Sequence, residues 1–89
     1  MKPIRLSEEA IKQVQQIRKG NSKLYEKLQK KLQIFQENPK HPSLRLHKLR
    51  SENGAMSVSI DMSIRVLFHE SADRILIVKI GKHEEVYGK

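Results

Sequence analysis

The 89-residue sequence contains no cysteine. Disulfide bonds and cysteine-ligated metal sites are therefore excluded, and cysteine gives no indication of the redox compartment. The sequence also lacks any apolar run near the ~18 residues that a membrane span needs, and its N-terminus lacks the apolar core of a secretory signal. We therefore expect a cytoplasmic protein with no membrane partner.

Motifs of several common active sites are missing as well. The four histidines, His41, His47, His69 and His83, are scattered and have no paired carboxylates beside them, so the spacing of a metal site is absent. There is no glycine-rich phosphate loop and no nucleophile elbow. We expect neither a metal nor a small-molecule cofactor.

Positive charge is the most prominent property that the sequence does have. It contains 18 Lys and Arg against 10 Asp and Glu, a net charge of +8, spread along the whole chain. This balance favours a polyanionic partner such as nucleic acid, an anionic membrane or an acidic protein. A solvated surface explains the charge about equally well. The length and the 37% content of hydrophobic residues suit one modest core, so we expect a single domain over residues 1–89.

Two helices are predicted in the first half of the chain. Ser7 is a typical N-cap because two carboxylates follow it in the first turn, and Gly20-Asn21 should end this helix. A second helix should begin near Asn21 or Ser22 and stop at Asn38-Pro39, since the residue before proline avoids helical geometry. Its apolar stripe is formed by Leu24, Leu28, Leu32 and Phe35. The short link between the helices predicts an antiparallel helical hairpin.

Alternation with a period of two follows Pro42 and predicts strands. We expect a short strand near residues 44–49, with tight turns at residues 61–63 and 71–73 between three longer strands at 56–60, 64–68 and 74–80. The last strand is almost continuously apolar, which is typical of a strand covered on both faces. Residues 2–6 should add an edge strand. The fold class is therefore α+β, with a helical hairpin packed on one face of a small, mostly antiparallel sheet.

Polar side chains should gather on the sheet face opposite the helices. Because successive residues of a strand alternate between faces, Ser57, Ser59 and Arg65 should share that face. The chain brings further polar groups toward it from both sides: His47, Lys48, His83 and Tyr87. Arginine binds phosphate oxygens bidentately, histidine acts as general acid or base, and tyrosine stacks on a base. These residues permit an RNase site that uses the 2′-OH of RNA, but a solvated arginine and a packed tail fit them too.

The order of elements and several motifs resemble the RelE/ParE superfamily of toxins from bacterial type II toxin–antitoxin systems, nearest to its RelE/YafQ-like branch. The resemblance covers essentially the full length. It rests on a lysine-rich second helix and on the segments Glu37-Asn38-Pro39, His41 to Leu49, Ser57 to Ile60, Ser63 to Phe68 and Ile77 to Tyr87. The strand arginine followed by the ending Ile-Gly-Lys-His-Glu-Glu-Val-Tyr is the most specific part.

The resemblance implies a ribosome-dependent mRNA endonuclease that inhibits translation. By this resemblance Arg65 would contact the phosphate in the transition state, and His83 would protonate the leaving 5′-oxygen. Tyr87 would stack on a base and help activate the 2′-OH, and His47 would act around the site. The residues expected to bind RNA are Arg45, Lys48, Ser57, Ser59 and Lys82 and, on the second helix, Lys23, Lys27 and Lys30, which would dock on ribosomal RNA. The helix lysines fit a solvated face as well. The resemblance also implies a cognate antitoxin protein as partner.

The sequence departs from this family at one pair of positions. Where some relatives carry two lysines and others an aspartate and a histidine, this chain has Ser57 and Ser59, which carry no charge. Either His47 takes the role of base, or catalysis is slow or absent. An alternative therefore stays open: a non-catalytic ParE-like inhibitor of DNA gyrase, or an inert relative that acts as a binding module.

Overall fold

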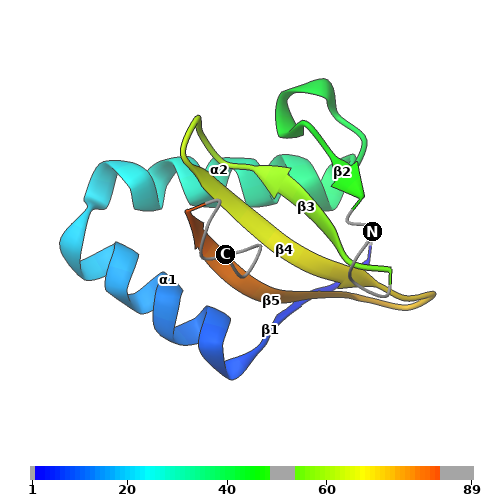
Figure 1. Cartoon of the computed structure of the whole chain (residues 1–89), viewed down its shortest axis with the longest axis horizontal. Coiled ribbons are helices and arrows are strands. Elements are labelled where there is room, and N and C mark those ends of the chain that lie inside the picture. The colour runs from blue at the N-terminus through cyan, green and yellow to red at the C-terminus, as the bar shows by residue number, and fades with distance from the viewer. Residues whose placement is uncertain (1, 49–53, 83–89) are drawn as a thin grey trace.

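The computed structural model describes residues 2–48 and 54–82. Within these residues two helices, one 3₁₀ turn and five strands follow one another, and Figure 1 shows their arrangement. Their bounds are β1 Ile4–Leu6, α1 Glu8–Gly20, α2 Ser22–Glu37, η1 Pro42–Leu44, β2 His47–Lys48, β3 Met56–Ser59, β4 Ile64–Glu70 and β5 Ile75–Lys82. No helix in the described ranges is both long and apolar enough to cross a bilayer.

Side-chain caps explain where both helices begin. The Ser7 hydroxyl accepts a hydrogen bond from the Ala10 backbone N–H at 3.1 Å, and the Asn21 side chain accepts one from Leu24 N–H at 3.0 Å. These bonds satisfy N–H groups that the first turn of a helix leaves without partners. Asn21 also ends α1, because its N–H donates to the carbonyl of Ile17. The predicted helix limits are therefore confirmed, and α2 turns back from α1 at this junction (Figure 1).

The sheet has the strand order β1-β5-β4-β3-β2. The β1–β5 pair is parallel, and the β5–β4, β4–β3 and β3–β2 pairs are antiparallel. Both helices lie on one side of the sheet (Figure 1). The predicted α+β class, the N-terminal edge strand and the mostly antiparallel sheet are confirmed.

The strand expected near residues 44–49 is mostly replaced by other structure. Leu44 belongs to the 3₁₀ turn η1, and of the described residues in this range His47 and Lys48 form β2, while residue 49 lies outside the described part of the chain. Pro42 opens η1, and the His41 side chain accepts a hydrogen bond from Ser43 N–H at 3.1 Å. The turn places Leu44 in the core, where it is fully buried.

The apolar sequence of β5 had predicted a strand covered on both faces, and this prediction is wrong for part of the strand. Ile75, Ile77 and Ile80 are buried, whereas Leu76 is 36% exposed. The register with β4 shifts by one residue beside Leu67 and Phe68, where a β-bulge inserts Val78. The bulge explains why the buried isoleucines are two and then three residues apart. Val78 packs instead against Ala55 and Leu67, a smaller cluster separate from the main core.

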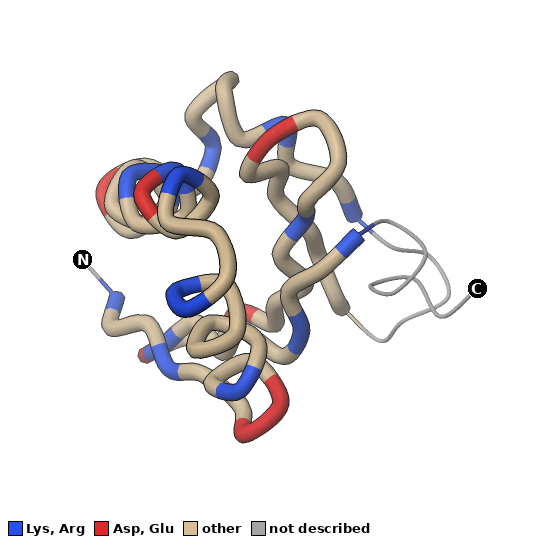
Figure 2. The backbone as a smooth tube through the Cα atoms, turned by 90° about the vertical axis from the view of Figure 1, so that its left-hand side faces the viewer, with Lys and Arg blue, Asp and Glu red and all other residues tan. Residues whose placement is uncertain are grey.

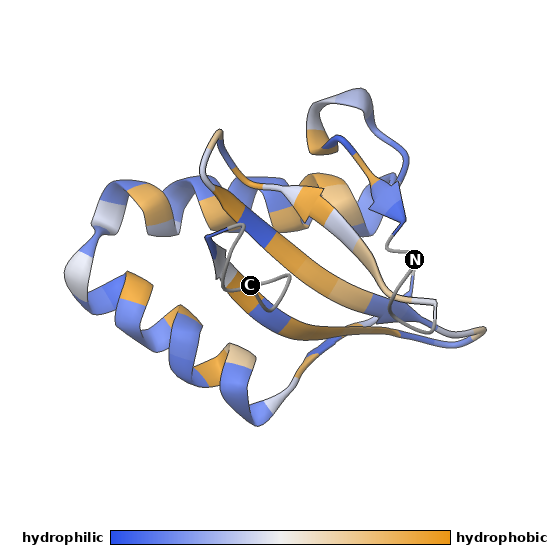
Figure 3. Cartoon of the chain, in the orientation of Figure 1, coloured by the Kyte–Doolittle hydropathy of each residue, from blue (hydrophilic) through white to orange (hydrophobic). Residues whose placement is uncertain are grey.

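The main core lies between the helices and the sheet. Phe35 of α2 and Phe68 of β4 meet edge to face, with ring centroids 4.6 Å apart, and both are buried. Figure 3 shows apolar positions along the central strands and on one stripe of each helix. This core holds the strands that carry the polar face described next.

Candidate functional site

Arg65 of β4 is held by its neighbours on the sheet face opposite the helices. Its Nε and Nη2 atoms donate hydrogen bonds to the Ser57 hydroxyl of β3, at 3.1 and 3.0 Å. Nη2 also donates to the backbone carbonyl of Arg45 at 3.1 Å. A guanidinium has five N–H donors, and the two on Nη1 have no partner among residues 2–48 and 54–82. One edge of the guanidinium is thus fixed while the other keeps donors for an anion.

The carbonyl that accepts the hydrogen bond from Arg65 Nη2 belongs to Arg45, a residue with unusual backbone geometry. Arg45 has φ +49° and ψ +56°, the left-handed region that glycine adopts without cost. It is the C-cap of η1, and its N–H donates to the Pro42 carbonyl at 3.2 Å. Arg45 therefore links η1 to Arg65 through the main chain, while its side chain is exposed.

The serine pair has a structural role in this arrangement. Ser57 is fully buried and accepts the two bonds from Arg65. Ser59 is 9% exposed, and its hydroxyl donates to the backbone carbonyl of Asp61 at 2.6 Å. Both lie on the Arg65 face, as the alternation predicted, since Ser59 pairs with Arg65 and Ser57 with Leu67.

The register also assigns the neighbouring strand residues to faces, because directly opposed residues of paired strands point the same way. His47 pairs with Ser57 and so lies on the Arg65 face, where it is exposed. Lys48 pairs with Met56, and Lys82 pairs with Ile64. Met56 and Ile64 pack against the main core. Lys48 and Lys82 are therefore assigned to the other face, at exposed strand ends, and not beside Arg65.

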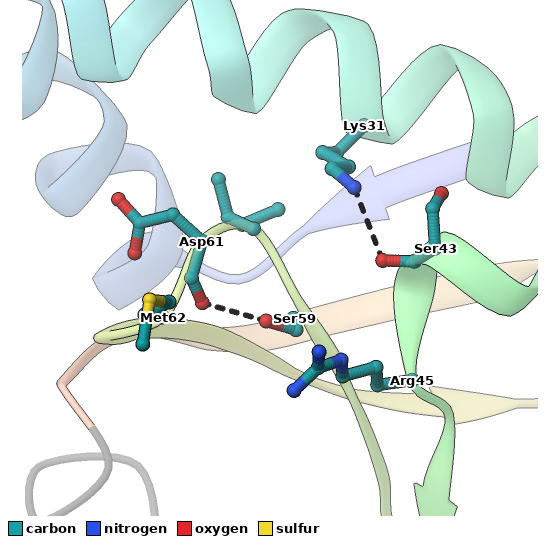
Figure 4. Close-up of a pocket in the computed structure, with 7 residues that line it drawn as sticks. Lys31, Ser43, Arg45, Ser59, Asp61 and Met62 are labelled. Carbon is teal, nitrogen blue, oxygen red and sulfur yellow. Dashed lines mark hydrogen bonds between the residues drawn. The ribbon is translucent and has the colours of Figure 1, made fainter.

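A polar hollow lies next to Arg65, between α2, η1 and the β3–β4 turn. Its volume is about 180 Å³, and its lining residues are Lys31, Ser43, Arg45, Ser59, Ile60, Asp61 and Met62 (Figure 4). The resemblance to the toxin superfamily implied Arg45 and Ser59 as RNA-binding residues but gave no binding role to Lys31 or Asp61. Lys31 follows Lys27 by four residues, so the two lie on the same face of the helix. This spacing could have added Lys31 to the predicted RNA-binding residues.

Asp61 organises the β3–β4 turn. Its Oδ1 accepts hydrogen bonds from the backbone N–H groups of Ser63 at 2.9 Å and Ile64 at 2.8 Å, and from the Ser63 hydroxyl at 3.3 Å. Partial burial raises the pKa of the carboxyl, but these hydrogen bonds and the charge of Lys27 outweigh it, so the pKa lies below its usual value. The predicted turn at residues 61–63 is confirmed, and Asp61 is its hydrogen-bonded anchor.

The three lysines expected to contact RNA from α2 are Lys23, Lys27 and Lys30, and all three are exposed. Figure 2 shows Lys and Arg positions on both helices and on the strands, with fewer acidic ones. Lys27 is near enough to Asp61 for its charge to affect that carboxyl. Lys31 of α2 and Asp61 of the β3–β4 turn also line one hollow, so this part of α2 lies beside the turn.

Two expected catalytic residues, His83 and Tyr87, lie outside the described residues. Within those residues the structure brings together Arg65, Ser57, Ser59, Arg45 and His47. No group of three or more histidine, aspartate or glutamate residues that could hold a metal ion is found in the same part of the chain. The assembled site can bind an oxyanion at Arg65, with an imidazole on the same face.

No protein-family model and no curated protein sequence matches this chain. Solved structures do match it. YafQ from Escherichia coli strain BL21(DE3) superimposes with a TM-score of 0.81 at 18% identity, covering 99% of this chain and 100% of that one. A YoeB/ParE toxin from Agrobacterium tumefaciens has a TM-score of 0.79 at 15% identity, with 93% and 99% covered. The YoeB–YefM complex from Staphylococcus aureus has a TM-score of 0.78 at 20% identity, covering 93% of this chain and 98% of the matched chain. The chain therefore has the RelE/ParE-like fold of the YoeB and YafQ toxins over nearly its whole length.

Proposed function

We propose that this protein is the toxin of a type II toxin–antitoxin system and an endoribonuclease that cleaves mRNA on the ribosome, in the cytoplasm. The 2′-OH oxygen of the RNA attacks the adjacent phosphorus while the bond from phosphorus to the 5′-oxygen breaks. The products are a 2′,3′-cyclic phosphate and a 5′-OH. The reaction needs a base for the 2′-OH proton, a positive charge for the phosphorane and an acid for the leaving oxygen.

The anchored guanidinium of Arg65 is the observation that carries this proposal. Ser57 and the Arg45 carbonyl fix its position before substrate arrives, which is how electrostatic stabilisation of a transition state becomes effective. The Nη1 donors, which have no partner in the described part of the chain, suit the oxygens of a phosphate. A solvated surface arginine would not have three hydrogen bonds that aim it at one place.

His47 is the described residue best suited to move a proton at this site. Its register opposite Ser57 puts it on the Arg65 face. The serines are poor bases, and the structure uses their hydroxyls to hold Arg65 and the β3–β4 turn. In the proposed mechanism His47 therefore accepts the 2′-OH proton, His83 protonates the 5′-oxygen and Tyr87 stacks on a base.

The same serines support a second candidate function. Both hydroxyls are engaged inside the protein, so no charged pair stands beside Arg65 on β3. A protein of this fold without such a pair would suit a ParE-like role, in which it inhibits DNA gyrase and cleaves nothing. The test below separates the two.

An antitoxin is the partner that we propose for the basic surface. Structures of the same fold include the YoeB–YefM complex from Staphylococcus aureus and the Escherichia coli DinJ–YafQ complex. The net charge of +8 favours an acidic segment that orders on contact. Ribosomal RNA and mRNA are the other proposed partners, with exposed lysines of α2 contacting ribosomal phosphates.

Brief induction of the wild type and of Arg65→Ala in bacteria, followed by primer extension on cellular mRNA, tests the proposal. Wild type should produce new mRNA ends in register with codons, and Arg65→Ala should reduce cleavage about a hundredfold or more, as loss of one transition-state donor does. Arg74→Ala is the matched control, because Arg74 is an exposed arginine in the β4–β5 turn. Intact mRNA together with relaxed plasmid DNA would instead support inhibition of gyrase.

A further inference from the structure

The hollow beside Arg65 contains two cations, and neither forms an ion pair with an acidic side chain of the described residues. Lys31 enters it from α2 and Arg45 from the segment after η1 (Figure 4). The ion pairs among the described residues, Lys2–Glu70 and Lys79–Glu9, lie elsewhere. Asp61 lines the hollow too, but Figure 4 shows its carboxylate turned away from Arg45. Its Oδ1 is also occupied by the turn.

The position of the Lys31 ammonium is fixed by the main chain around it. The Lys31 Nζ donates to the Ser43 carbonyl at 3.0 Å, which holds the ammonium at the wall of the hollow and leaves further N–H donors. The half-buried stem of Lys31 restricts its freedom. The hollow thus combines an ammonium and a guanidinium, which suit phosphate oxygens.

The backbone of Arg45 supplies an independent argument. At φ +49° a residue with a Cβ atom is strained, and glycine or asparagine would fit at lower cost. A backbone carbonyl of any residue at position 45 could accept the hydrogen bond from Arg65, so that contact does not explain why position 45 is an arginine. A guanidinium needed in the hollow does explain it, because strained backbone persists where the side chain is used.

We propose that Lys31 and Arg45 form a second phosphate subsite, which holds a phosphate of the RNA strand next to the one at Arg65. This inference rests on the proposed nuclease function and extends it. Arg45 connects the two subsites, since its carbonyl contacts Arg65 and its side chain lines the hollow. A single strand lying from β4 toward α2 would place consecutive phosphates over both, and the second contact would add to the affinity of the strand for the site.

Binding of a 2′-O-methyl RNA hexanucleotide, which has no 2′-OH to react, tests the subsite over a range of salt concentrations. Arg45→Gly and Lys31→Met should each raise the Kd about tenfold, as loss of one charge-assisted hydrogen bond does. The slope of log K against log salt should fall by about 0.7, the value for one phosphate contact on a single strand. The double variant should lose no more slope than either single variant, because both cations hold one phosphate. Lys12→Met, an exposed lysine of α1, should leave the slope unchanged.

Folding defects are separated by the choice of variants. Arg45→Gly relieves the strained φ, so its midpoint of urea unfolding should match or exceed that of the wild type while RNA binding falls. Arg45→Asn, which also tolerates this φ, should behave likewise. If both variants fold normally and bind the hexanucleotide as tightly as the wild type, the subsite does not exist.

Cleavage kinetics separate failure of the subsite from failure of the proposed function. With the subsite in place, Arg45→Gly raises the KM for ribosome-bound mRNA and leaves kcat nearly unchanged, whereas Arg65→Ala lowers kcat. If Arg65→Ala abolishes cleavage but Arg45→Gly and Lys31→Met change neither KM nor Kd, the nuclease stands and the subsite is wrong. If the two variants weaken hexanucleotide binding while no mRNA is cleaved by any form, the subsite stands and the nuclease is wrong. Reduced affinity for a polyglutamate peptide with unchanged RNA binding would assign the hollow to an acidic protein and overturn the proposal.

Discussion

The guanidinium of Arg65 on β4 reaches across to β3 and donates two hydrogen bonds to the buried hydroxyl of Ser57. One hydroxyl oxygen thus accepts two hydrogen bonds from the same guanidinium. Ser57 is therefore a positioning residue for Arg65, and this contact explains why an uncharged serine occupies position 57.

Replacement of Ser57 by alanine should therefore weaken both folding and activity. The change removes the acceptor of a charge-assisted pair in a buried place, which costs about 1–3 kcal/mol of unfolding free energy. The kcat for mRNA cleavage should fall, with little change in KM, because Arg65 loses its alignment. A double-mutant cycle with Arg65→Ala checks this by urea unfolding and by cleavage rates. Additive effects on both readouts would show that the two residues act independently.

Ser7 joins the start of α1 to the bulge in β5. Its hydroxyl accepts from Ala10 N–H and donates to the Val78 carbonyl at 2.8 Å. Ser7→Ala should lower the unfolding free energy by about 1–2 kcal/mol, since it removes a helix cap and the second bond. Ser7→Asp keeps an acceptor for Ala10 but has no hydrogen for Val78, so it should be more stable than Ser7→Ala. Ser22→Ala, at an exposed position in the first turn of α2, is the control in the same urea titration and should have little effect.

Asp61 should make the stability of the protein depend on acid pH. Its pKa is lower in the folded chain than in the unfolded chain, so its carboxylate stabilises the fold fully above the unfolded pKa of about 3.9. This stabilisation is lost as the pH falls through the lowered folded pKa. The difference in unfolding free energy between the wild type and Asp61→Asn should be constant from pH 7 to about pH 5 and shrink below about pH 4. Urea unfolding at a series of pH values measures it.

Lys27 offers a second readout for the same turn. Because its charge lowers the Asp61 pKa in the folded chain, Lys27→Met should reduce the amount of unfolding free energy that is lost on acidification, while the pH at which the loss begins, set by the unfolded pKa, stays the same. High salt should reduce this difference from the wild type by screening. An equal loss in Lys27→Met and the wild type at low salt would mean that the two charges are not coupled.

The contact between Phe35 and Phe68 joins α2 to the middle of the sheet. Both rings are buried, so Phe35→Ala should lower the unfolding free energy by about 3–5 kcal/mol, and Phe35→Leu by less. Gln33→Ala, at an exposed position of the same helix, should have little effect. Urea unfolding of the three variants checks the order. A loss for Phe35→Ala as small as that for Gln33→Ala would contradict the packing described.

The sequence by itself determined the features that depend on neighbours along the chain. Ser7 and Asn21 act as helix caps through contacts three residues away, and Pro39 limits α2 sterically. The alternation of strands placed Ser57, Ser59 and Arg65 on one face, because the period of two is a property of the extended backbone. The fold class followed from these local signals.

Only the tertiary structure decided the relationships between distant residues. The left-handed conformation of Arg45 brings its carbonyl to Arg65, twenty residues later, and the path of the chain places Lys31 and Asp61 around one hollow. The bulge at Val78 appears only when β5 is paired with β4. Such contacts arise from packing over long separations, and no periodicity or spacing in the sequence records them. The chain therefore specifies its elements locally, and the proposed site is assembled by the way those elements pack.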